Sequence, residues 1–147
     1  MNLEPHKESG TGVLRIGLAL VFLWFGSNQL LFTKDWLVWL PQAAFHLPIS
    51  AEFLVMLNGL MEVALGLFLL LGLFTRFASL LLGLHLIPII LTVGYNDIGV
   101  RDFGLMIAMF SLAISGPGKW CLDMRFKERL MAKKFFNSLY FLEKKAQ

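Results

Sequence analysis

Four long apolar runs constrain the fold of this chain more than any other feature of its sequence. They cover residues 13–32, 51–74, 77–94 and 98–115, and a helix needs about 20 mostly apolar residues to cross a bilayer. The chain is 57% hydrophobic and only 16% charged, whereas soluble domains are about 25% charged. The pattern therefore predicts an all-α polytopic membrane protein, an antiparallel bundle of four transmembrane helices.

Short polar or glycine-rich breaks separate some of these runs. Thr75 and Arg76 are expected to join the second and third spans as a tight hairpin, and Gly116, Pro117 and Gly118 to end the fourth, since Pro and Gly terminate helices. Pro88 lies inside the third span, where membrane helices tolerate proline.

The basic residues predict the orientation of the bundle. With four spans, both termini share one side, and eleven of the thirteen Lys and Arg residues fall there, leaving Lys34 and Arg101 on the other. The positive-inside rule then places both termini in the cytoplasm, in a multi-pass inner-membrane protein. Since this bias accounts for most of the basic charge, we expect no nucleic-acid partner.

Two segments outside the spans are also patterned. Residues 33–50, with Trp36 and Trp39, are expected to lie on the outer membrane surface, because tryptophan favours that interface. Residues 123–147 form a second region after the bundle of residues 1–122, and 123–142 read as a basic amphipathic helix on the inner leaflet. That helix could serve as a simple anchor or dock a partner.

Glu62 is the strongest candidate for a functional residue, because it is the sole charged side chain between Leu60 and Phe74. A rise of 1.5 Å per residue puts it ~16 Å into a core of ~30 Å. An isolated ionised carboxylate is costly there, so it needs a proton, a partner or water. Most other polar residues of the spans lie in the outer half, and with Glu62 they form the candidate ligand-binding or proton-exchanging set: Asn28, Gln29, Asn58, His85, Asn96, Asp97, Arg101 and Asp102.

These residues predict a polar pocket that opens to the outer side with Glu62 as its floor. Arg101 is the expected cationic partner of Glu62, and His85 is the second choice. The alternative is that the same side chains hold the helices together by interhelical hydrogen bonds. No metal, haem or flavin motif is found, and the single cysteine, Cys121, excludes a paired-thiol mechanism within the chain.

Four blocks of the sequence resemble the DoxX-like family of small membrane proteins. They are RIGLALVFLWFGSNQL, NGLMEVALGLFLLLGLFTRFASLLLGLHL, NDIGVRDFG and GPGKWCLD, and together they run from Arg15 to Asp123. The resemblance implies a four-helix membrane bundle of bacteria or archaea that is associated with redox complexes. It also implies that Glu62, Asn96, Asp97, Arg101 and Asp102 occupy the polar positions of the family.

One position departs from the family pattern, and it bears on the mechanism because a lysine there could pair with an acid whereas a glutamine is neutral. Many members end the first span with Gly-x-x-Lys-Leu, where this chain has Gln29 before Leu30.

The resemblance favours a membrane subunit of an oxidoreductase, with a pocket for a quinone headgroup or a small sulfur oxyanion. A non-catalytic accessory or scaffold subunit is the alternative, and a small transporter or channel is a third hypothesis. Other subunits of a membrane complex are the expected partners, and the sequence leaves homo-oligomer formation open.

Overall fold

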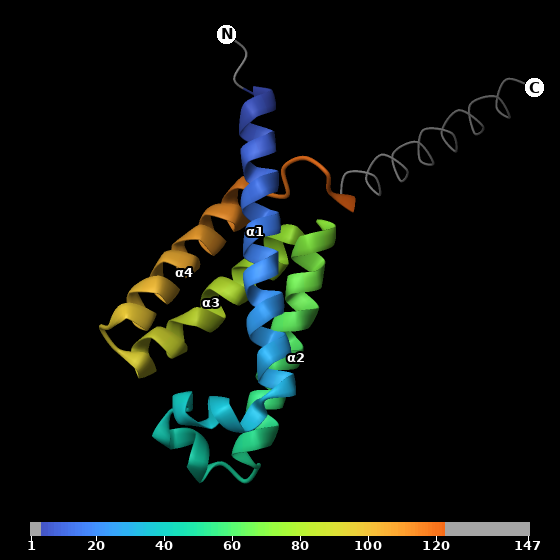
Figure 1. Ribbon diagram of the computed structural model, residues 1–147. Helices are drawn as coiled ribbons and strands as arrows, with labels where there is room; N and C mark the ends of the chain where they lie inside the picture. Colours follow the sequence, from blue (N-terminus) through green and yellow to red (C-terminus); the bar gives the residue numbers. More distant parts are fainter. Residues whose placement is uncertain (1–3, 123–147) are drawn as a thin grey trace, which may run out of the picture.

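The computed structural model describes residues 4–122, in which six helical elements follow one another (Figure 1). They are α1 (Glu4–Leu31), the 3₁₀ helices η1 (Thr33–Trp39) and η2 (Gln42–His46), α2 (Ala51–Leu71), α3 (Thr75–Val93) and α4 (Asp97–Ser115). All four α-helices are long and apolar enough to cross a membrane. The prediction of an all-α membrane bundle is therefore confirmed, while the expected amphipathic helix at 123–142 lies outside the described residues.

The four helices run antiparallel and form two pairs. α1 packs along α2 and α3 packs along α4, whereas the two pairs share far fewer contacts (Figure 1). Glycines allow the close approach of α1 and α2: a Cβ on Gly26 would lie 2.7 Å from the carbonyl oxygen of Gly59. Small residues at such seams are the usual device for close helix packing in lipid.

The hairpin between α2 and α3 begins three residues earlier than predicted. Gly72 takes the left-handed conformation with φ of 66°, and the Leu73 N–H donates to the Phe68 carbonyl, so α2 ends at Leu71. This is the usual glycine-terminated helix end. Thr75 and Arg76, expected to form the break, already belong to α3.

α1 begins at Glu4, well before the predicted start at residue 13. The extra turns are supported by the segment after α4, because the Lys119 N–H donates to the Glu8 carbonyl. A Cβ on Gly118 would lie 2.6 Å from the Gly12 nitrogen. A tertiary contact with a distant segment therefore extends the helix into polar sequence.

Arg15 ties this end of the bundle together from a fully buried position. Its guanidinium donates to the Leu69 and Leu70 carbonyls at the C-terminus of α2, and to the Pro117, Lys119 and Trp120 carbonyls after α4. The last carbonyls of a helix lack intrahelical partners, so a buried cation satisfies both α2 and the segment that follows α4.

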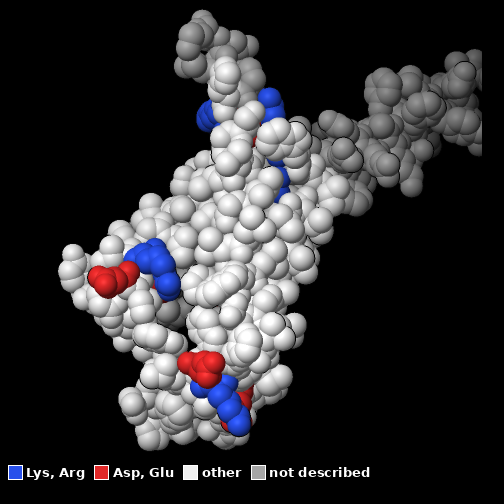
Figure 2. Space-filling model, viewed as in Figure 1, with Lys and Arg blue, Asp and Glu red and all other residues white. Residues whose placement is uncertain are grey.

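The apolar core lies next to this Arg15 network, where all four helices meet. Its buried members are Leu18, Ala19, Phe22, Leu65, Leu69, Ala78, Leu82, Leu86, Met109 and Leu112. Towards the opposite end the two pairs diverge, and η1 and η2 fold beneath them (Figure 1). In the view of Figure 2, charged side chains lie in three groups, at the top, at the left edge and near the bottom, and the surface between these groups is uncharged, as expected for a surface that faces lipid.

Candidate functional site

A cavity of about 480 Å³ lies where the two helix pairs diverge, and all four helices and the 33–50 segment contribute to its wall. Its wall is mostly apolar: Phe22 and Phe25 come from α1, Leu54 and Val55 from α2, Leu86 and Ile89 from α3, and Leu105 from α4. A small polar patch interrupts this surface, formed by Gln29, Asn58, Glu62 and His85, with Arg101 and Asp102 from α4. Small-molecule sites commonly combine such an apolar wall with a few polar groups.

Glu62 lies in this wall with only 3% of its surface exposed, held by two amide side chains. Gln29 Nε2 donates to Glu62 Oε2 at 2.9 Å, and Asn58 Nδ2 donates to Glu62 Oε1 at 3.2 Å. Asn58 Nδ2 also donates to Gln29 Oε1 at 2.7 Å, which closes a ring of three side chains. The ring crosses the α1–α2 seam beside Gly26 and Gly59, so close packing of the two backbones fixes its geometry.

His85 of α3 lies beside the same carboxylate. Its Nε2 atom lies 3.4 Å from Glu62 Oε1, within the distance of an ion pair if the imidazole is protonated. The alignment does not make a hydrogen bond, and Nε2 is buried without a hydrogen-bond partner among the described residues. Unsatisfied buried polar atoms are uncommon in proteins and call for an explanation. The residue itself is among those that line the cavity.

Arg101 does not contact Glu62, contrary to the first expectation from the sequence. Its guanidinium makes an ion pair with Asp102, with both Nε and Nη2 2.8 Å from Asp102 Oδ1. The physical reason is depth, because Arg101 lies in the first turns of α4 and its neighbour Asp102 is closer than the mid-helix carboxylate of Glu62. His85, the second choice, is the ionisable neighbour of Glu62.

Arg101 also contacts α1 through an aromatic ring. Its Cζ lies 4.9 Å from the centre of the Phe25 ring, and Phe25 makes an edge-to-face contact with Trp36 of η1 at 5.8 Å. Both contacts are of stabilising types. They link α4, α1 and η1 around the cavity.

Segment 33–50 covers the cavity in addition to exposing apolar side chains. Trp36, Trp39, Pro41 and Leu47 contribute to the wall. Trp39 and Leu47 also keep about half of their surface exposed, as does Phe45, and Val38 is exposed still more. The sequence predicted a segment on the membrane surface and missed this covering role. Its two tryptophans were the available signal, but the same residues are expected in any interfacial segment.

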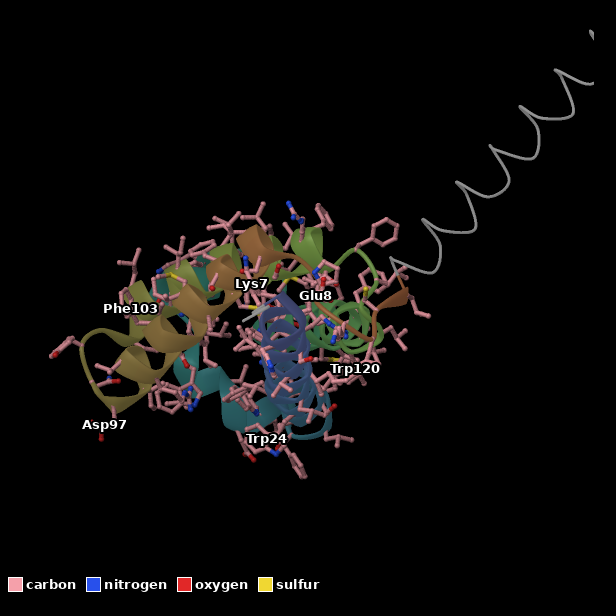
Figure 3. The ribbon with its side chains drawn as sticks, turned by 90° about the horizontal axis from the view of Figure 1, so that it is seen from above. Lys7, Glu8, Trp24, Asp97, Phe103 and Trp120 are labelled. Carbon is pink, nitrogen blue, oxygen red and sulfur yellow. The ribbon has the colours of Figure 1, made fainter. Side chains whose placement is uncertain are left out.

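The remaining candidates do not line the cavity. Asn28 donates to the Trp24 carbonyl of its own helix, and Asn96 caps α4 by accepting from the Ile98 and Gly99 N–H groups. Asp97 is exposed in the first turn of α4, at the far end of that helix in the view of Figure 3. The side chains of Asn28 and Asn96 therefore form hydrogen bonds with the nearby backbone.

A family model described as DoxX matches residues 10–95, which include most of α1, both 3₁₀ helices, α2 and α3. An uncharacterized membrane protein of Mycobacterium tuberculosis is 30% identical, over 86% of this chain and 88% of its own length. No solved structure matches. The matched region contains Gln29, Asn58, Glu62 and His85, and α4 with Arg101 and Asp102 follows it.

Proposed function

The chain belongs to the DoxX family of membrane proteins, and we propose that it is a membrane subunit of an oxidoreductase that holds a quinone-type compound in its cavity. The observation that carries this proposal is the polar patch around Glu62 and His85 in the wall of an otherwise apolar cavity of about 480 Å³. This volume falls within the usual range for small-ligand sites, roughly 300–1,000 Å³.

The chemistry of the wall favours a quinone over a sulfur oxyanion. A quinone has a flat ring with two carbonyl acceptors and an apolar tail, which matches one polar patch within apolar surroundings. An oxyanion would lie beside the carboxylates of Glu62 and Asp102, and the guanidinium of Arg101 is already paired with Asp102. Like charges at such distances repel strongly where water is scarce.

The fit to a quinone also rests on His85. His85 is among the residues that line the cavity, with 18% of its side chain exposed, and an imidazole in this position offers a hydrogen-bonding group to a carbonyl oxygen of a bound ring. A bound quinone supplies the capacity to take up or release electrons and protons. The chain's own residues bind and orient it, and we assign the exchange of electrons to a partner subunit.

The Arg15 network argues against a channel. Fully buried Arg15 joins the end of α2 to the segment after α4, and the apolar core lies between this network and the cavity. A continuous polar path through the bundle would have to cross both. The cavity is therefore proposed as a dead-end site that opens towards the outer side of the membrane.

A scaffold subunit is the second candidate function, favoured by the ring of Gln29, Asn58 and Glu62. These hydrogen bonds lie within the protein and are of the kind that joins membrane helices. In this case the ring would stabilise the α1–α2 seam and the cavity would hold lipid.

Purification from the native membrane tests the proposal. The protein should co-purify with an isoprenoid quinone, detected by mass spectrometry of the lipid extract, and with a subunit that carries a redox cofactor. Leu86→Trp, which fills the cavity, should lower the quinone content, whereas Leu84→Trp on an exposed position of the same helix should not. Equal quinone content in both variants would refute binding in this cavity.

A further inference from the structure

We infer that Arg101 donates a hydrogen bond to a carbonyl oxygen of the ligand's headgroup, and that Asp102 is a positioning residue that holds the Arg101 guanidinium at the cavity wall. This inference rests on the proposed function and names the residue of α4 that meets the quinone ring. It places the headgroup near the start of α4, where Arg101 lies.

The first step is that two contacts hold the guanidinium of Arg101. Its Nε and Nη2 atoms each lie 2.8 Å from Oδ1 of Asp102, which is itself only 5% exposed. Its Cζ atom lies over the Phe25 ring, 4.9 Å from the ring centre. Arg101, Asp102 and Phe25 all line the cavity. The guanidinium is therefore fixed between two other residues of the cavity wall.

The second step concerns the N–H groups that Asp102 does not use. Arginine carries five N–H donors in a planar fork, and Asp102 accepts from Nε and from Nη2. Both N–H groups of Nη1 and one of Nη2 remain, and they have no acceptor among residues 4–122. Because the fork is planar, these three groups point away from Asp102. The Arg101 side chain is 48% exposed, which leaves room for an acceptor beside them.

The third step compares the other donors of the polar patch. The amide nitrogen of Asn58 already donates to Gln29 Oε1 and to Glu62 Oε1. Gln29 donates one N–H to Glu62 and is only 4% exposed. The ring of His85 is partly exposed, but its Nε2 atom is buried against Glu62. Arg101 is therefore the donor of the patch that combines unused N–H groups with a well-exposed side chain.

The ion pair also selects the type of headgroup. Asp102 compensates the charge of Arg101, and the carboxylate of Glu62 lies in the same wall. An anionic headgroup would therefore meet no excess of positive charge. A neutral carbonyl oxygen needs only a donor, and a hydrogen bond from an ionised donor is stronger than one from a neutral donor. The site thus favours a neutral carbonyl compound.

Two matched probes test this assignment: a benzoquinone with a ten-carbon chain, and the benzene with the same chain but no carbonyl groups. Calorimetry of the full chain in lipid nanodiscs, corrected with empty nanodiscs, gives the affinity for each probe. Wild type should bind the quinone more tightly than the benzene. Equal affinities would overturn the inference, because no donor would then distinguish the headgroup.

The test variants avoid leaving an unpaired buried carboxylate. Asp102→Asn is the reference and should keep the preference for the quinone, because its amide oxygen still accepts from the guanidinium. Adding Arg101→Met to it should lower quinone affinity about ten- to a hundredfold, the effect of one hydrogen bond from a charged donor, and leave the affinity for the benzene probe unchanged. Full preference in the double variant would overturn the inference while leaving the proposed function in place.

Two further variants separate position from charge. Asp102→Leu keeps Arg101 but removes the oxygen that holds it, so the preference for the quinone should fall partially and return in Asp102→Asn. Equal preference in these two variants would refute the positioning role of Asp102. Arg76→Met, at an exposed arginine at the start of α3, should behave as wild type.

A measurement on the wild type covers the case in which the double variant does not fold. Solid-state NMR with ¹⁵N-labelled arginine and a quinone carrying ¹³C at its carbonyl carbons should detect a guanidinium nitrogen about 4 Å from a carbonyl carbon, as a hydrogen bond requires. The same contact should persist in Arg76→Met. Its absence would overturn the inference. If wild type binds neither probe, the proposed function fails, and this inference fails with it.

Discussion

His85 Nε2 on α3 lies 3.4 Å from Glu62 Oε1 on α2, and this contact joins the α1–α2 pair to the α3–α4 pair at the wall of the cavity. On the other side of Glu62, Gln29 and Asn58 complete a polar ring across the α1–α2 seam. The buried carboxylate of Glu62 therefore accepts a hydrogen bond from Gln29 of α1 and lies beside His85 of α3. This relationship decides which pairs of residues should be energetically coupled.

Glu62 should be coupled to His85 and nearly independent of Arg101. A double-mutant cycle with Glu62→Gln and His85→Phe should give an interaction energy of about 0.5–3 kcal/mol, as residues in contact do. The cycle of Glu62→Gln with Arg101→Gln should give a value near zero, since Arg101 pairs with Asp102. Unfolding in mixed detergent micelles measures both cycles.

Glu52→Gln serves as the control for Glu62→Gln, because Glu52 is an exposed glutamate on the same helix. Its substitution should change stability little. Coupling of Glu62 to Arg101 as large as its coupling to His85 would contradict the observed pairing.

Arg15→Lys should destabilise the bundle by about 2 kcal/mol or more. The guanidinium carries five N–H donors in a planar fork, whereas an ammonium group has three on a point charge, so several of the five backbone carbonyls around Arg15 would lose their partners. Thermal unfolding followed by tryptophan fluorescence measures the loss.

Arg76→Lys is the matched control, since Arg76 is exposed at the start of α3. It should cost under about 0.5 kcal/mol, as most surface substitutions do. Equal melting temperatures for the two variants would show that the buried network does not stabilise the fold.

Gly26→Ala should separate α1 from α2, whereas Gly17→Ala should not. A Cβ on Gly26 would lie 2.7 Å from the Gly59 carbonyl oxygen and 2.9 Å from Val63, while a Cβ on Gly17 meets nothing within 4 Å. Overpacking of this kind costs about 1–3 kcal/mol. Unfolding in detergent compares the two variants, and a smaller loss for Gly26→Ala than for Gly17→Ala would refute close packing at this seam.

Impermeant thiol labelling of intact cells tests the orientation. In a Cys121→Ala background, Gln42→Cys in η2 should be labelled from outside and Lys7→Cys near the start of α1 should not. Both positions are exposed in the fold, so accessibility depends on the side of the membrane. Labelling of Lys7→Cys alone would reverse the topology that the positive-inside rule predicts.

The sequence by itself determined the number of spans and the α-helical class. Runs of about 20 apolar residues can satisfy their backbone in lipid only as helices, and this constraint does not depend on which helices become neighbours. The i, i+4 spacing of Asn58 and Glu62 places the two residues on one face of α2, and their side chains are hydrogen-bonded. Helix ends were less predictable, because Gly72 and the docking of residue 119 on α1 shifted them.

Only the tertiary structure decided which polar side chains meet. Residues 29, 62 and 85 lie on three different helices, and their contact depends on helix rotation, which the glycine seam at Gly26 and Gly59 fixes through close backbone packing. Charge alone favoured Arg101 as the partner of Glu62. In the fold, however, the nearest carboxylate to the Arg101 guanidinium is that of Asp102, and these two residues form the ion pair. The cavity likewise exists because the helix pairs diverge away from the apolar core and residues 33–50 fold over the gap, a geometry that hydrophobic runs alone do not specify.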